Sequence, residues 1–218
     1  HTTHGIAQAP AYLSGLENGL MLGTGDPIIV SDRGATITWD GQRICGVWLT
    51  AMAIDLSVDR AKKYGTATMA IRRSGHIACL AAFLTRATDK GCMIELASSD
   101  PSIVSVAPYG GTKPAFTPNP IAIGIPTNKN PILIDISASI TTNGLTGRLF
   151  SEGKKLPGDW VQDKSGRATN DPSVLFTEPP GTILPIGGKE YGHKGFGLAL
   201  MIEALTQGLS GLGRADPP

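Results

Sequence analysis

The chain has 218 residues, of which 41% are hydrophobic, and it carries 19 basic against 18 acidic side chains. This apolar content is enough for one large or two small folded domains, and it excludes an intrinsically disordered chain. Because the charges nearly cancel and no basic run exceeds two residues, the sequence favours a small molecule over nucleic acid or an anionic membrane as its partner.

Three cysteines, Cys45, Cys79 and Cys92, lie in apolar surroundings without CxxC spacing. This pattern predicts buried free thiols in a reducing compartment and argues against a zinc site. No apolar run approaches the roughly 18 residues that span a bilayer, and no signal-peptide pattern is present. We therefore expect a cytoplasmic protein. Because the sequence opens at a helix approach and stops soon after a helix, we also expect native segments to be missing at both ends.

The first half of the chain predicts alternating helices and strands. A helix is expected from Gly5 to Gly19, with apolar side chains near one face. A hairpin is expected around residues 32–34, followed by a helix over 47–64 that Gly65 ends. Next come a strand over 66–73, a helix over 77–90 and a strand over 92–99. This strand–helix–strand order predicts a parallel crossover, with the turn at residues 74–76 as a ligand position.

From Asp100 the sequence becomes rich in Gly, Pro and Asn. Two strands are expected within it, over residues 121–125 and 132–136. A helix is expected in the second part of residues 137–153, and DKSGRATNDP reads as a polar turn region. Loops this dense in turn residues, held by rigid strands, often carry function.

The segment LPIGGKEYGHKGFGLALMIEALTQG begins at Leu184 and predicts a glycine-rich loop that enters an apolar helix. Glycines let a backbone approach a phosphate, a helix N-terminus adds partial positive charge, and Lys194 supplies a full charge. The segment is neither a Walker A loop nor a GxGxxG motif. Equally, Gly195 and Gly197 could serve only tight helix packing.

Two histidines are candidates for chemistry. His4 lies at a helix start and could exchange a proton near neutral pH, or be an ordinary capping or surface residue. His76 follows a predicted strand and could face a ligand, or belong to a helix approach. No HxH, HxxxH or GxSxG spacing is present, so no metal site is expected.

Polar residues elsewhere are open to two interpretations. Asp135 ends an apolar strand just before Ser137 and Ser139, which suits a polar ligand or the capping of the next helix. Asn119 lies between two prolines and could orient a substrate or only shape a turn.

The joint order of the motifs is more specific than any one of them. In chain order these are THG, RRSGHIACLAAF, APYGG, FTPNPIAIGIP, DISAS, TTNG, GDWVQDKSGRATNDP and LPIGGKEYGHKGFGLALMIEALTQGLSG. Together they resemble the malate/L-lactate dehydrogenase family of NAD(P)-dependent oxidoreductases, which includes ureidoglycolate, sulfolactate, diketogulonate and cyclic-imino-acid reductases. The resemblance spans essentially all 218 residues.

The resemblance implies an α/β fold built on a mixed sheet, distinct from the GxGxxG Rossmann fold. It implies one catalytic unit over residues 1–218, with a cofactor-binding core over 66–211, and a homodimer with sites near subunit contacts. By the same resemblance, His4 would donate a proton to the substrate, assisted by Thr3, while hydride passes between the substrate and NAD or NADP. The residues expected at the cofactor are His76, Asp135, Ser137, Ser139, Lys194 and Gly195.

The sequence departs from the family at the position of the substrate carboxylate. Many relatives carry an arginine shortly after the histidine, where this chain reads Ile6-Ala7-Gln8. The remaining candidates for binding a 2-oxo acid, a 2-hydroxy acid or a cyclic imine carboxylate are Arg148, Thr117, Asn119, Thr142 and Asn143. The departure also motivates an alternative, a non-catalytic small-molecule-binding or structural homodimer that retains the scaffold.

Overall fold

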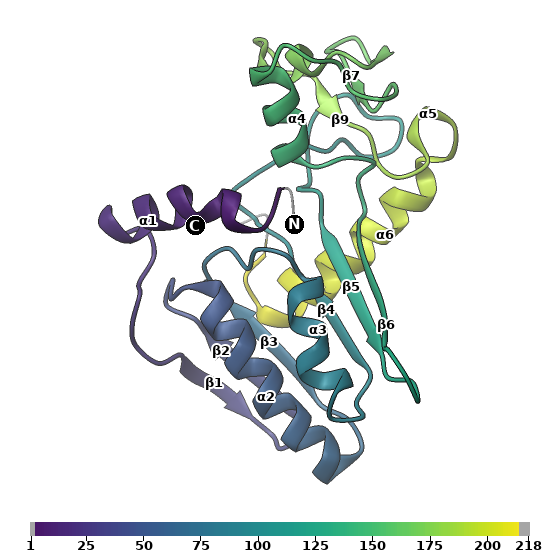
Figure 1. Ribbon diagram of the computed structural model, residues 1–218. Coiled ribbons are helices and arrows are strands. Elements are labelled where there is room, and N and C mark those ends of the chain that lie inside the picture. Colours follow the sequence, from purple (N-terminus) through teal and green to yellow (C-terminus); the bar gives the residue numbers. More distant parts are fainter. Residues whose placement is uncertain (1–2, 214–218) are drawn as a thin grey trace. The chain divides into compact units, whose positions relative to one another are not determined.

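A computed structural model describes residues 3–213 (Figure 1). The chain divides into two compact units. Among the described residues, unit 1 consists of residues 3–96, 122–135 and 208–212, and unit 2 of residues 97–121, 136–207 and 213.

The sheet of unit 1 has the strand order β1-β2-β3. β1 (Ile28–Asp32) runs antiparallel to β2 (Thr36–Asp40), and β2 runs parallel to β3 (Thr68–Arg72). The turn between β1 and β2 is closed by the carboxylate of Asp32, which accepts a hydrogen bond of 2.9 Å from the backbone N–H of Gly34. The expected hairpin is therefore confirmed.

Helix α2 (Gly46–Tyr64) connects β2 to the parallel strand β3. It ends at Gly65, whose φ of +86° is the left-handed conformation that glycine adopts most easily. Ala53 of α2 packs on Ile37 and Trp39 of β2, so the helix covers one face of this sheet. The helix and its end match the sequence expectation.

The expected crossover between the strands at 66–73 and 92–99 is wrong. β3 lies in the first sheet, whereas β4 (Ile94–Ala97) lies in a second sheet with β5 (Pro120–Ile125) and β6 (Ile132–Ser137). The parallel crossover is one helix earlier, through α2, because α2 packs on β2 and returns the chain beside it. The parallel and antiparallel pairings together confirm the mixed α/β class.

Helix α3 (Ala81–Thr88) begins four residues later than the expected start at residue 77. Ala78 has a φ of +56°, which a helix does not allow. The first turn of α3 instead begins where the backbone N–H of Ala81 donates 2.8 Å to the carboxylate of Asp135. In Figure 1, α3 lies beside α2, and the core between them contains Ile54, Val58, Phe83 and Ala87.

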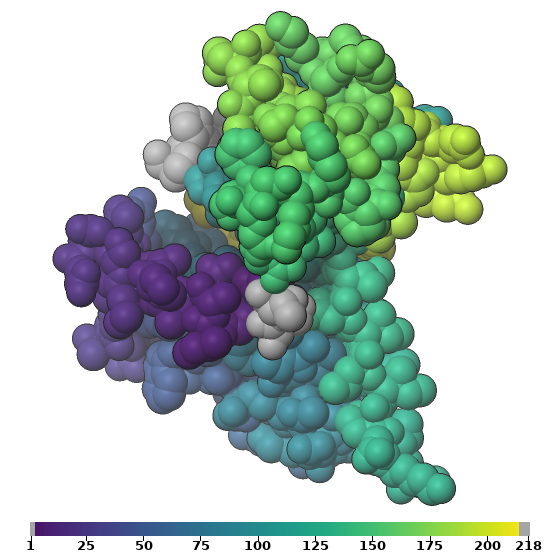
Figure 2. Space-filling model, turned by 45° about the horizontal axis from the view of Figure 1, so that its top comes forward, coloured from purple at the N-terminus to yellow at the C-terminus, as the bar shows by residue number. Residues whose placement is uncertain are grey.

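The N-terminal helix forms as expected but does not bury an apolar face within the described residues. A short turn η1 (Ile6–Gln8) leads into α1 (Ala9–Glu17), and neither contains a buried residue. The side chains of Ile6 and Leu13 are 89% and 59% exposed. α1 accordingly lies on the surface of unit 1, where it is purple in Figure 2.

Unit 2 contains a small sheet in which β7 (Val161–Gln162) lies between β8 (Ala168–Thr169) and β9 (Thr182–Ile183). Helix α4 (Asn143–Ser151) is capped by Thr142, whose hydroxyl accepts from the backbone N–H of Leu145 at 3.2 Å. The expected polar turn region contains the β7–β8 turn and leads into η2 (Pro172–Phe176). One core cluster of this unit contains Val106, Leu156, Val161 and Ile183, and a second contains Ile121, Ala138, Ala199 and Ile202.

The glycine-rich segment is helical, which corrects the expected loop. α5 (Gly188–Tyr191) is joined through Gly192 to α6 (His193–Glu203), which continues into the π-helical turn η3 (Ala204–Gly208). His193 and Lys194 therefore lie in the first turn of α6. The sharp bend is at Gly187, with a φ of +95°, where an added Cβ would lie 2.3 Å from the carbonyl oxygen of Tyr191.

The three cysteines are free thiols, as expected. Each is only partly buried, although the sequence predicted buried thiols. Within residues 3–213, no helix is long and apolar enough to cross a membrane.

Candidate active site

Two histidines from distant parts of the chain meet in unit 1. The rings of His4 and His76 stack with their centroids 5.7 Å apart and an interplanar angle of 24°. The hydroxyl of Thr3 lies 2.8 Å from Nδ1 of His4. The side-chain amide of Gln8 donates 2.8 Å to the carbonyl oxygen of Thr3. The structure thus brings together three of the predicted site residues, Thr3, His4 and His76.

The turn that carries His76 is fixed by its backbone. The N–H of Gly75 donates 3.0 Å to the carbonyl oxygen of Ile44. At Gly46, the first residue of α2, an added Cβ would lie 2.0 Å from the carbonyl oxygen of Gly75. Only a glycine allows this approach. The close contact of the turn with the start of α2 therefore positions His76.

The electrostatic surroundings lower the pKa of His4 below its ordinary value of 6.5. Burial contributes most, because it disfavours the charged ring, and a charge on His76 acts in the same direction. The negative charge of Asp135 opposes both effects. A lower pKa makes the protonated ring of His4 a stronger acid.

Tyr12 of α1 also belongs to this cluster, although it was not among the predicted site residues. Its hydroxyl lies 2.8 Å from Nδ1 of His76 and donates 2.7 Å to the carbonyl oxygen of the same residue. Burial raises the pKa of Tyr12 to about 12, Cys45 adds to the rise, and a backbone hydrogen bond at Ala78 lowers it. The tyrosine therefore keeps its proton at neutral pH. We name Thr3, His4, Tyr12 and His76 the histidine cluster.

Asp135 acts as a helix cap, but for α3 rather than for the helix that follows it in sequence. One carboxylate oxygen accepts from the backbone N–H of Ala81 at 2.8 Å and lies 3.7 Å from Sγ of Cys79. Asp135 lies in β6, far from α3 in the sequence, so this cap could not be assigned from local sequence. Its contact with a cofactor stays a prediction.

In unit 2 the segment Ser137–Ser139 lies against the start of α6. The hydroxyl of Ser137 donates 2.8 Å to the carbonyl oxygen of Ser139. The N–H of Ile186 donates 2.8 Å to the carbonyl oxygen of Ala138, and the N–H of Gly195 donates 3.2 Å to that of Ile186. A Cβ on Gly195 would lie only 2.3 Å from the nitrogen of Ile186. The structure thus brings Ser137, Ser139 and Gly195 together.

These contacts change the interpretation of the glycine segment. The N–H of Gly195 donates to the carbonyl oxygen of Ile186, so this one amide of the first turn of α6 is already engaged within the chain. Gly195 serves close packing, whereas an added Cβ on Gly197 would meet nothing within 4 Å. The charge of Lys194 remains exposed, with Nζ 5.6 Å from the ring centroid of Tyr191.

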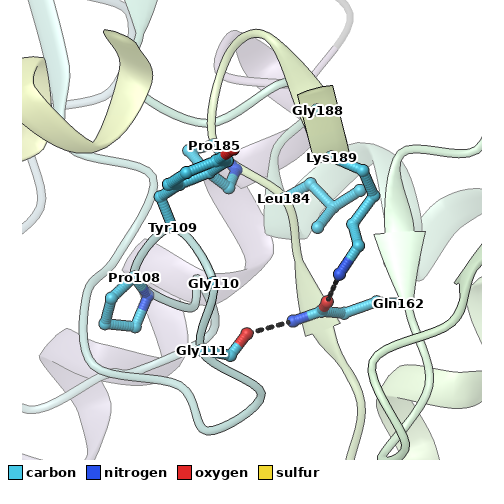
Figure 3. Close-up of a pocket in the computed structure, with 9 residues that line it drawn as sticks. All are labelled: Pro108, Tyr109, Gly110, Gly111, Gln162, Leu184, Pro185, Gly188 and Lys189. Atoms are coloured by element: carbon cyan, nitrogen blue, oxygen red, sulfur yellow. Dashed lines mark hydrogen bonds between the residues drawn. The ribbon is translucent and has the colours of Figure 1, made fainter. Parts of the chain in front are cut away.

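A cavity of about 180 Å³ lies in unit 2 beside α5 (Figure 3). The buried amide of Gln162 accepts 3.1 Å from Nζ of Lys189 and donates 2.8 Å to the carbonyl oxygen of Gly111. Lys189, rather than Lys194, therefore brings positive charge to this cavity. Lys189 was not among the predicted site residues. In the sequence it directly follows the glycine pair 187–188, which is the local signal that could have identified it. The lining residues are Pro108, Tyr109, Gly110, Gly111, Gln162, Leu184, Pro185, Gly188 and Lys189.

The candidates for substrate binding divide into buried and exposed residues. Asn119 is fully buried: its amide nitrogen donates 2.8 Å to the carboxylate of Glu203 and 3.3 Å to the carbonyl oxygen of Ala199. Its amide oxygen accepts 2.6 Å from Thr117, which is also buried. Asn119 and Thr117 are therefore buried polar residues that are hydrogen-bonded to one another, and Asn119 is also hydrogen-bonded to α6.

The other candidates lie on or beside α4. The hydroxyl of Thr142 caps the helix, and Asn143, its first residue, is exposed. The side chain of Arg148 is 43% exposed, with Nε 3.9 Å from the carboxylate of Glu152. Asn143 and Arg148 are therefore the candidates with accessible side chains. In residues 3–213 no three His, Cys, Asp or Glu side chains lie together as a metal site.

The model of the protein family described as malate/L-lactate dehydrogenase matches residues 1–216. The L-sulfolactate dehydrogenase of Methanothermobacter thermautotrophicus is 31% identical over 96% of this chain and 59% of its own length. The Delta(1)-pyrroline-2-carboxylate/Delta(1)-piperideine-2-carboxylate reductase of Pseudomonas syringae pv. tomato is 33% identical, with the same two shares of 96% and 59%. The chain thus spans about three-fifths of the length of these relatives.

A solved structure shares the fold. The malate dehydrogenase from Entamoeba histolytica superposes with a TM-score of 0.89 at 27% identity, over 96% of this chain and 60% of that chain. The expected fold type, an α/β fold of the malate/L-lactate dehydrogenase kind, is confirmed.

Proposed function

The chain belongs to the malate/L-lactate dehydrogenase family, and on that premise we propose that the protein is an NAD- or NADP-dependent oxidoreductase. Its substrate class is a 2-oxo or 2-hydroxy acid, or a cyclic imine carboxylate. The names of its relatives support this class, since they include dehydrogenases of hydroxy acids and a reductase of cyclic imine carboxylates. The observation in this chain that carries the proposal is the stacked pair of His4 and His76, with Thr3 on Nδ1 of His4.

Reduction of a carbonyl builds negative charge on oxygen, and of an imine on nitrogen, so a nearby acid lowers the barrier. His4 would provide this acid. Thr3 holds Nδ1, and the proton on Nε2 would pass to the substrate heteroatom. The lowered pKa of His4, caused first by burial, strengthens it as a donor. In the reverse direction the neutral ring would accept the proton of the 2-hydroxy acid.

A nicotinamide cofactor, when bound, supplies or accepts the hydride at the substrate carbon. The donor groups of this chain fit a cofactor with phosphates, because Lys194 is exposed in the first turn of α6 and Lys189 lines the cavity of unit 2. We propose that His76, Asp135, Ser137, Ser139 and Lys194 hold it, and that Gly195 contributes by packing the start of α6 closely against Ile186.

The carboxylate of the substrate needs a cation or several hydrogen-bond donors. Gln8 is engaged with the backbone of Thr3 and so supports the histidine cluster. We therefore assign the substrate carboxylate to Arg148, with Thr142 and Asn143 at the start of the same helix as polar partners. Thr117 and Asn119 are buried, which supports an indirect role: they would fix the position of the start of β5.

We also propose a cytoplasmic homodimer. The homodimer is supported by strand β6, on which five consecutive residues, Ile132 to Ile136, are exposed although four of them are apolar. Such a surface is typical of a protein contact.

The test is an absorbance assay of NADH and NADPH oxidation against a panel of 2-oxo acids and cyclic imine carboxylates. Cofactor-dependent turnover of one of these classes supports the proposal. Tight cofactor binding without turnover of any of them would instead favour the non-catalytic binding protein.

A further inference from the structure

The protonation of the histidine cluster is restricted by contacts on His76. The backbone N–H of Ala78 points at Nδ1 of His76 over 3.2 Å. A backbone amide can only donate, so Nδ1 has to offer its lone pair and cannot itself carry a proton in this arrangement. Ala78 also has a φ of +56°, a conformation that costs a non-glycine residue energy.

The hydroxyl of Tyr12 reinforces the same state. It lies 2.8 Å from Nδ1 and 2.7 Å from the carbonyl oxygen of His76, so its proton lies between two acceptors. The edge of the Tyr12 ring also meets the His76 ring at 74°, with centroids 5.8 Å apart. Since the pKa of Tyr12 is raised to about 12, mainly by burial, the hydroxyl remains a donor at the pH values where histidines titrate.

We propose that Tyr12 is a positioning residue that, with the N–H of Ala78, keeps Nδ1 of His76 unprotonated, so that His4 is the member of the stacked pair that carries the proton. Two stacked imidazoles 5.7 Å apart cannot both be charged without mutual repulsion. A neutral His76 removes that repulsion from His4. As a proton donor His4 depends on this arrangement, and in this respect the inference rests on the proposed function.

The charged and titratable groups around the pair act in known directions. Asp135 favours the charged form of His4, and a charge on His76 disfavours it. Cys45 favours the protonated form of Tyr12. Sγ of Cys79 lies 3.7 Å from the carboxylate of Asp135. The hydroxyl of Tyr12 can either donate to Nδ1 of His76 or accept from it. The direction in which its removal moves the titration of His76 distinguishes these two roles.

The test is an NMR titration of isotope-labelled histidines in the wild type and in Tyr12→Phe, without substrate or cofactor. The phenylalanine keeps the ring and removes only the hydroxyl. If the hydroxyl donates to Nδ1, Tyr12→Phe moves the titration midpoint of His76 to higher pH and that of His4 to lower pH. If the hydroxyl instead accepts from a protonated Nδ1, the midpoint of His76 moves to lower pH. That result, or no movement, overturns the proposal.

The matched control is Tyr64→Phe, the same change at the end of α2, which should leave both midpoints in place. A second measurement uses the wild type alone: the nitrogen shifts of neutral His76 should show the proton on Nε2, and a proton on Nδ1 would contradict the proposal even if the variant failed to fold. In an active enzyme, Tyr12→Phe should also move the pH profile of reduction to lower pH. Because the NMR titration needs no turnover, its outcome stands apart from that of the activity assay.

Discussion

The ring of His4 lies on the ring of His76 with their centroids 5.7 Å apart, although one residue precedes the first helical turn of the chain and the other follows β3. Two glycines make this possible, since Gly46 and Gly75 let the turn before His76 approach the start of α2. The pair therefore depends on the fold of unit 1, and substitutions in the fold and in the site have separate consequences.

The two glycines of α6 should respond oppositely to alanine. At Gly195 an added Cβ would lie 2.3 Å from the nitrogen of Ile186 and 2.7 Å from the carbonyl oxygen of Ala138. Because these are backbone atoms, Gly195→Ala should lower the free energy of unfolding by about 2 kcal/mol or more. Gly197→Ala meets open space and should raise it by up to about 1 kcal/mol, through helix propensity. Urea denaturation of both variants measures the difference, and equal effects would contradict the packing of α6.

Asp40 should stabilise unit 1 in a pH-dependent way. It is 2% exposed, and it accepts hydrogen bonds of 3.1 Å from Nε of Arg72 and 2.9 Å from Nε of Arg73. Burial pushes its pKa up, but the hydrogen bonds from Arg73, the Gln42 backbone and Arg72 outweigh it, so the pKa is lowered.

A folded pKa below the unfolded value of about 3.9 means that the stabilisation is present above that pH and is lost as the pH falls through the folded value. Asp40→Asn should therefore lower the free energy of unfolding by about 2 kcal/mol at pH 7. The difference from the wild type should shrink below about pH 4. Denaturation curves at neutral and acidic pH measure this. A loss that does not change with pH would show that the carboxylate charge is not responsible.

Substitutions of Lys194 and Lys189 distinguish two candidate positions for a cofactor phosphate. If the exposed charge in the first turn of α6 is the phosphate contact, Lys194→Ala should raise the cofactor dissociation constant about tenfold, since a hydrogen bond to a charged group contributes about 1.5 kcal/mol. Lys189→Ala tests the rival position, because Lys189 donates to Gln162 within the cavity, and it should then leave the constant unchanged. Calorimetric titration with NADH and NADPH gives both constants. A loss confined to Lys189→Ala would move the phosphate contact into that cavity.

The sequence predicted those elements whose signals are local. The β1–β2 hairpin and the whole of α2 follow from side-chain periodicity and from glycines that end or turn the chain, and both are confirmed. Strand pairing was less accessible, because the sequence pattern does not say which strand returns beside which. The crossover through α2 became visible only in the register of β2 with β3.

The candidate site shows the same limit. His4 and His76 were each identified as candidates, but their stacking, and the hydroxyl of Tyr12 on Nδ1, depend on tertiary structure. Likewise, the start of α3 is set by the carboxylate of Asp135, which comes from a distant strand. A single sequence holds no local signal for such contacts.

The central claim, that His4 is the proton donor, is tested most directly by the turnover of His4→Ala. Removal of a general acid should reduce kcat by roughly two to four orders of magnitude, with the cofactor dissociation constant nearly unchanged. Leu13→Ala, an exposed change on α1, is the control and should retain wild-type turnover. If His4→Ala turns over at the rate of this control, His4 is not the proton donor and the proposed mechanism is contradicted.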